Sequence, residues 1–127
     1  TGLAVLPDSR IVVVDNNGSR LLILTPEGHL ERAFGKYGQD RPLEFARPQS
    51  VAVLHTSNII VVSANDSKRL QVVTPEGDFV GFVEYEAPGS PVCVAVVDEA
   101  HVVVTANGGV VIVDITEACQ HLTKGAL

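Results

Sequence analysis

The chain has 127 residues, one domain's worth, with 46% hydrophobic and 19% charged residues, which excludes a disordered tail. Nine basic and fifteen acidic residues give a net charge of −6, so the chain is not a generic polyanion binder, and any nucleic-acid contact would need a local basic patch. The apolar residues are mainly Val, Leu, Ile and Ala, with no Trp and no Met. Val and Ile favour β-strands.

Targeting and redox signals point to the cytoplasm. No apolar run approaches the roughly 20 residues of a membrane helix, and no basic start precedes an apolar segment as in a signal peptide. Cys93 and Cys119 are not part of a CxxC motif, and we expect two reduced thiols. Because the chain begins with Thr-Gly and contains no Met, we expect it to be a piece of a longer protein.

Short apolar segments separated by turns predict four strands in the first part of the chain. The turn segments 7–9, 16–19 and 26–28 are rich in Pro, Asp, Asn, Ser and Gly, the usual turn residues. No segment has a convincing 3.6-residue period, so we expect almost no helix. The expected strands are residues 3–6, 10–15, 20–25 and, more weakly, 29–34.

This pattern then recurs along the chain. Residues 3–6 match 51–54 and 94–97, residues 11–14 match 59–62 and 102–104, and residues 20–28 match 69–77 and, in part, 109–115. The match of 20–28 with 69–77 includes a repeated Thr-Pro-Glu-Gly. Runs such as 12–14 and 60–62 are apolar on both faces, which indicates strands between packed layers. We expect Val13, Ile23, Val61 and Val72 to be buried.

Four short strands per unit of about 45 residues are typical of a β-propeller blade. We therefore expect an all-β fold of four-stranded antiparallel blades, with the first strand of each innermost. The expected units are 2–47, 48–91 and 92–118, followed by a tail, 119–127. A β-sandwich of about 11 strands is the alternative, which the repeat spacing disfavours. Since propellers close with 4–8 blades, we expect an arc of a larger ring, favouring six blades, with the others in the parent protein or a partner chain.

A known propeller repeat is matched by residues in each unit. In the first unit and its linker these are Gly2, Leu3, Ala4, Val5, Val12, Val13, Val14, Asp15, Asn17, Arg20, Gly28, Phe34, Gly35, Gly38, Phe45 and Pro48. The second unit keeps Asn65, Arg69 and Gly77, whereas the third keeps Asn107 and lacks the Arg. With these residues the units resemble NHL repeats, the propeller repeat of tripartite-motif ubiquitin ligases and related proteins. The lack of Trp disfavours WD40 blades.

The resemblance implies a protein-interaction propeller that recruits a partner or substrate, at the C-terminus of an E3 ubiquitin ligase whose RING domain lies outside this chain. An RNA-binding propeller is the alternative, and a propeller lyase or hydrolase is a distant third.

Charge sorting predicts where a partner binds. In a propeller, the loops between second and third strands share one face with the linkers between blades, and Tyr and Arg often anchor interfaces. Acidic residues on the same face, including Asp15 and Glu44, dilute its charge and favour a protein over RNA. Phe45 is expected beside the candidate residues, which are Arg20, Lys36, Tyr37, Arg41, Arg47, Lys68 and Arg69.

No catalytic or metal site is predicted. His29, His55 and His101 fall in turns, and His121 lies beyond the last unit, so no three ligands converge as zinc requires. No nucleophile elbow, P-loop or GxGxxG motif is present. We expect no cofactor. Asp15 is expected to accept hydrogen bonds from turn amides, while Arg20 pairs with a carboxylate and ties one blade to the next.

Overall fold

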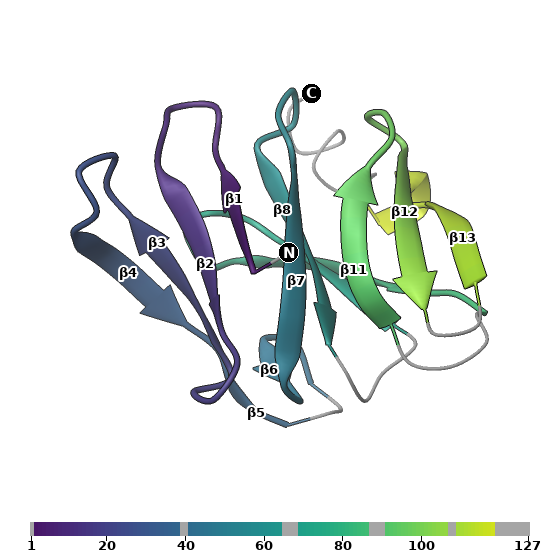
Figure 1. The fold of residues 1–127 in the computed structure, drawn as a ribbon, viewed down its shortest axis with the longest axis horizontal. Helices are drawn as coiled ribbons and strands as arrows, with labels where there is room; N and C mark the ends of the chain where they lie inside the picture. The colour runs from purple at the N-terminus through teal and green to yellow at the C-terminus, as the bar shows by residue number, and fades with distance from the viewer. Residues whose placement is uncertain (1, 39–40, 65–68, 87–90, 107–108, 119–127) are drawn as a thin grey trace.

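The chain folds into successive antiparallel sheets that fan out side by side (Figure 1). The structure is a computed structural model and describes residues 2–38, 41–64, 69–86, 91–106 and 109–118, with only the backbone of Pro91 and Val92. Its one helical element within these ranges is a single turn at 116–118. None of its helices there has the length and apolar character needed to cross a membrane.

Each of the larger, antiparallel sheets is one propeller blade. Blade 1 has the order β1 (Leu3–Val5), β2 (Ile11–Asp15), β3 (Arg20–Leu24), β4 (Leu30–Phe34). Blade 2 repeats it with β7 (Pro48–Leu54), β8 (Ile59–Ala64), β9 (Arg69–Val73) and β10 (Phe79–Glu84). Blade 3 contains β11 (Pro91–Val96), β12 (His101–Ala106) and β13 (Gly109–Asp114). These sheets confirm the expected all-β propeller fold.

The first strand of each blade is the innermost. In the middle of the arc β7 contacts both β1 and β11, so the three first strands lie side by side (Figure 1). The blade 1 to blade 2 linker contains a short parallel pair, β5 (Lys36–Tyr37) and β6 (Glu44–Phe45). We call the side with this linker and the β2–β3 loop the linker face. The opposite side, with the turns 6–10, 25–29, 55–58 and 97–100, is the hairpin face.

The hydrophobic core lies between blades rather than inside any one sheet. One buried cluster joins blade 1 to blade 2 and includes Val12, Ile23 and Val62; a second joins blade 2 to blade 3 and includes Val61 and Val104. Blade 2 is covered on both faces, and every residue of β8 is buried. Alternating side chains of a strand point to opposite faces, so a strand between two neighbours is apolar throughout.

Strand register corrects one burial prediction. Ile23, Val61 and Val72 are fully buried, as expected, but Val13 is only half-buried and its neighbour Val12 has no exposed surface. Val12 pairs with Ala4 and Ile23, as Val61 pairs with Ala52 and Val72. The β7–β8 connection therefore holds one more residue than β1–β2. An ungapped alignment equates Val13 with Val61, and a shift of one residue moves a side chain to the other face.

The repeated Thr-Pro-Glu-Gly forms the same turn in both blades. The amide of Gly28 donates to the Thr25 carbonyl at 2.9 Å, and that of Gly77 donates to the Thr74 carbonyl at 3.0 Å. Both glycines have a positive φ, near +92° and +94°, which glycine adopts without strain. The threonine hydroxyl accepts the next amide, from His29 or Asp78, at 3.1 Å. This turn chemistry explains the repeated motif.

Candidate binding face

The linker between blades 1 and 2 presents four of the seven predicted binding residues. Lys36 and Tyr37 form β5, Arg41 precedes β6, and Arg47 lies between β6 and β7; all four side chains are exposed. Tyr37 is the most open of the large aromatic side chains described, with 67% of its surface exposed. Lys68 lies outside the described residues. The linker therefore carries an aromatic ring among cations on one side of the arc.

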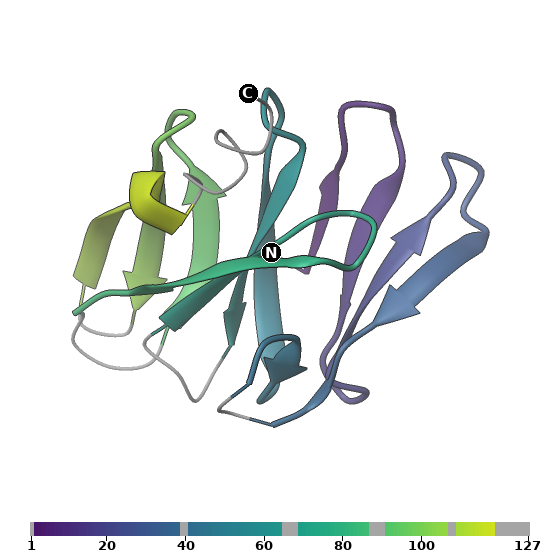
Figure 2. The same ribbon diagram turned by 180° about the vertical axis from the view of Figure 1, so that it is seen from behind.

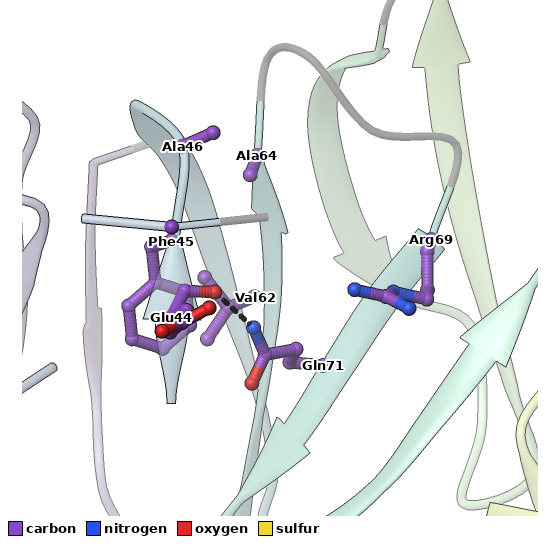
Figure 3. A pocket seen from close by; sticks show the side chains of 8 residues that line it. Glu44, Phe45, Ala46, Val62, Ala64, Arg69 and Gln71 are labelled. Carbon is purple, nitrogen blue, oxygen red and sulfur yellow. Dashed lines mark hydrogen bonds between the residues drawn. The ribbon is translucent and has the colours of Figure 1, made fainter. Parts of the chain in front are cut away.

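Gln71 of blade 2 holds this linker in place. Its Nε2 donates to the Glu44 carbonyl at 2.6 Å (Figure 3), and its Oε1 accepts from the Leu43 amide at 3.0 Å. The side chain is only 6% exposed, and buried hydrogen bonds of this kind are costly to break. Sequence reasoning missed Gln71, although a polar residue within the apolar strand Arg69-Leu-Gln-Val-Val was a visible signal.

Phe45 anchors the linker instead of joining the binding face. Only 1% of its surface is exposed, and it belongs to the core cluster between blades 1 and 2. Gly35, with φ near +109°, leaves room for this ring, because a Cβ there would lie 2.7 Å from Phe45. The expectation that Phe45 lies beside Tyr37 on the surface is wrong, since burial of the ring is what fixes the linker to the blades.

Arg20 is engaged within its own blade. Its guanidinium donates to the Asp15 carboxylate, with Nη2 at 2.8 Å and Nε at 3.2 Å, and the Gly18 amide donates to the same carboxylate at 3.0 Å. The hydrogen bonds from Arg20, followed by that from Gly18, lower the pKa of Asp15. The expected bond from a turn amide to Asp15 is confirmed, but the described partner of Arg20 is not on another blade, because Asp15 lies directly opposite it in the β2–β3 pairing.

Arg69 is half-buried and lies 3.8 Å from the centroid of the Phe82 ring. In blade 1 the residue opposite Arg20 is Asp15. In blade 2, extending the β8–β9 pairing by one residue places Ala64 opposite Arg69, so the equivalent acid is missing there. Arg69 also borders a pocket of about 20 Å³, together with Gly38, Glu44 and Gln71 (Figure 3). That volume suits about one water molecule. Arg69 thus belongs to blade 2 and borders the same pocket as the linker residues Gly38 and Glu44.

Contacts between blades were largely missed from sequence. On the linker face, the Asn16 side-chain amide donates to the Pro48 carbonyl at 2.9 Å. On the hairpin face, a ring nitrogen of His55 lies 3.0 Å from the Val5 carbonyl. At the outer edge, Arg32 Nη1 donates to the Glu76 carbonyl at 2.6 Å. These residues hold adjacent blades in a fixed arrangement.

Acids on the hairpin face are paired with Arg10, whose side chain is 19% exposed. Its guanidinium contacts Asp8 at 2.7 Å, Glu31 at 2.8 Å and Glu76 at 4.0 Å. Since Glu76 belongs to blade 2, this network also spans two blades. Among the described residues, no group of three His, Cys, Asp or Glu side chains is arranged to hold a metal ion.

A curated relative shares part of this sequence. The chain is 33% identical over 81 residues to protein brain tumor of Drosophila melanogaster. The match covers 63% of this chain and 8% of that protein, so the chain spans a small part of its relative. No protein-family model matches the chain.

Solved structures share the fold at low sequence identity. Hydrazine synthase of Kuenenia stuttgartiensis superposes with a TM-score of 0.72 at 12% identity, over 91% of this chain and 32% of that one. Virginiamycin B lyase of Staphylococcus aureus has a TM-score of 0.59 at 17% identity, over 89% and 40% of the two chains. These likenesses establish an arc of β-propeller blades, and the similarity to brain tumor supports blades of the NHL type.

Proposed function

We propose that this arc is a protein-interaction module whose linker face recruits a partner or substrate carrying an acidic segment. The observation that supports it best is the exposed Tyr37 on a linker that also exposes Lys36 and Arg41 and is fastened by Gln71 and Phe45. A preorganised aromatic and cationic surface binds with little ordering cost, and Tyr and Arg are frequent interface anchors.

The proposal extends to the parent protein. We propose a tripartite-motif-like E3 ubiquitin ligase in the cytoplasm, with its RING domain outside this chain; the similarity to brain tumor over 81 residues supports an NHL-type propeller as part of it. The module itself then has no catalytic step and positions the substrate for the ligase.

RNA binding is the second candidate. An exposed Tyr beside Lys and Arg is the combination on which single-stranded bases stack while phosphates meet cations. The pairing of Arg20 with Asp15 and the net charge of −6 weaken this reading.

The test compares two probes, an acidic Glu- and Leu-containing peptide and a single-stranded RNA of about ten nucleotides, each at low and high salt. Arg41→Ala with Arg47→Asn removes two exposed cations, and Asn tolerates the positive φ of residue 47. We expect peptide binding to weaken at least tenfold, with a melting temperature within about 2 °C of the parent chain. RNA binding that falls steeply with salt would favour the second candidate.

The matched control is Glu27→Ala with Asp78→Ala, two exposed acids in turns away from the linker. It should leave binding unchanged. Loss of binding in this control, with none in the cation variant, would show that the partner contacts another surface.

A further inference from the structure

The outer edge of blade 3 is open in the described part of the chain. In blades 1 and 2 the third strands, β3 and β9, each pair on the outer side with a fourth strand, β4 or β10. The third strand of blade 3, β13, pairs only with β12 among the described residues (Figure 2). Its sequence, Gly-Val-Val-Ile-Val-Asp, lacks the Lys and Pro that often protect an edge strand from pairing.

A groove lies beside the C-terminal end of this edge, at Asp114. It has a volume of about 590 Å³, within the size range of ligand pockets. One wall is β10, residues Phe79–Glu84, and the other is formed by Asp114, at the end of β13, and the helical turn, with Glu117 and Ala118. The lining contains apolar residues of β10 and Ala118, and three acids, Glu84, Asp114 and Glu117, which we call the rim.

The groove continues an interface that already exists. Val80, Val83 and Ala118 line it and also pack against the core cluster between blades 2 and 3. Between blades 1 and 2, the corresponding space is filled by polypeptide: a Cβ on Gly77 would lie 3.3 Å from Phe34, and Arg32 bonds to Glu76. In that pair, the fourth strand of one blade packs against the outer hairpin of the next.

We propose that the β13 edge and this groove bind an extended segment of a partner polypeptide, which adds to blade 3 as its fourth strand. Main-chain hydrogen bonds to β13 provide the pairing, and alternate apolar side chains face Val80 and Val83, which pack on the blade 3 side of blade 2. Because the rim is acidic, the segment carries Lys or Arg near its ends. This site shares no residue with the exposed cations of the linker face and does not depend on the function proposed for them.

The probe is a nine-residue peptide of alternating Val and Thr with Lys at both ends, compared with the same peptide flanked by Glu. We expect the Lys-flanked peptide to bind about threefold to tenfold more tightly, as two exposed charge contacts allow. A central Pro should abolish binding because Pro cannot donate to a ladder and breaks an extended pairing. Hydrogen exchange should show slower exchange of β13 amides in the complex.

Charge-reversed proteins test the groove itself. In Glu84→Lys with Glu117→Lys, two exposed rim acids, we expect the preference to reverse towards the Glu-flanked peptide. Glu27→Lys with Asp78→Lys makes the same net charge change in exposed turns and should keep the original preference. No binding of the Lys-flanked peptide at 1 mM, protection at β1 or β4 instead of β13, or a dimer whose β13 amides are already protected would each overturn the proposal.

Discussion

Val12 and Val13 are chemically identical neighbours with different environments. Val12 lies in the core between blades 1 and 2 with no exposed surface. Val13 is half-buried and points to the other face of blade 1, away from blade 2. The difference arises because successive residues of a strand face opposite sides of the sheet.

We predict that Val12→Ala lowers the free energy of unfolding by about 1.5–3 kcal/mol, the cost of removing buried methyl groups and leaving a cavity. Val13→Ala should cost less than about 1 kcal/mol, because that side chain is only partly removed from water. Urea unfolding of the two variants measures the difference. Equal losses would contradict the register described here.

His101 makes a pH-dependent contact on the hairpin face. Its Nδ1 lies 2.9 Å from the Asp98 carboxylate, and Asp114 lies 3.9 Å from Nε2. The hydrogen bond to Asp98, with the charges of Asp98 and Asp114, raises the pKa of His101 above its usual 6.5. The protonated ring is therefore favoured in the folded protein.

The stabilising contribution of His101 should be fully present below pH 6.5 and disappear as the pH rises through the higher pKa of the folded state. We predict that the difference in urea midpoint between the parent chain and His101→Gln shrinks as the pH is raised across this range. A constant difference from pH 5.5 to 8.5 would show that the ring is not coupled to these carboxylates.

At the scale of elements, the linker between blades 1 and 2 depends on contacts far away in sequence. Gln71 reaches two backbone groups of residues 43 and 44, and Phe45 enters the core. The corresponding position in blade 1 is Leu22, since Val13 pairs with Leu22 as Val62 pairs with Gln71. The Gln71 side chain in blade 2 thus stabilises the linker through two hydrogen bonds, which Leu22 in blade 1 cannot form.

Gln71→Leu should therefore loosen the linker without disrupting the blade. We predict faster hydrogen exchange at the Leu43 amide and a stability loss of about 1–3 kcal/mol, because that buried amide and the Glu44 carbonyl lose their partners. Binding to the linker face should weaken although its cations remain. Gln49→Leu, a matched change at a half-buried position of β7, should leave the Leu43 amide protected. Unchanged exchange in Gln71→Leu would contradict the anchoring role.

At the scale of the whole molecule, the two end blades differ from the middle one. Blade 2 is covered on both faces, whereas blade 1 exposes Leu3 and Val5 at 57% and 49%, and blade 3 exposes Val110 and Ile112 at 66% and 64%. Side chains of the same type are buried where a neighbouring blade is present. We propose that further blades, in the parent protein or a partner chain, cover these surfaces in a larger ring.

The isolated arc should accordingly bind the hydrophobic dye ANS, which reports exposed apolar surface. We predict that replacing Leu3, Val5, Val110 and Ile112 with Thr reduces ANS fluorescence severalfold while the chain stays folded by circular dichroism. Thr at Tyr37 and Val97, which are exposed in the linker and in a turn outside these patches, should have a smaller effect. Equal effects of the two sets would argue against a blade-binding role for the end faces.

The strands, the turns and the repeat of the blades could be read from the sequence, because apolar alternation and turn residues such as Pro26 and Gly28 act locally. The same reasoning placed Arg20 and Arg41 at the linker end of their blades. It did not place Val13 or Phe45, and it assigned Arg20 a partner on another blade. Those features depend on an extra residue in the β7–β8 connection, on a ring that enters a core built from two blades, and on cross-strand pairing. Burial and side-chain partners follow from register and from contacts between distant segments, so only the tertiary structure decided them.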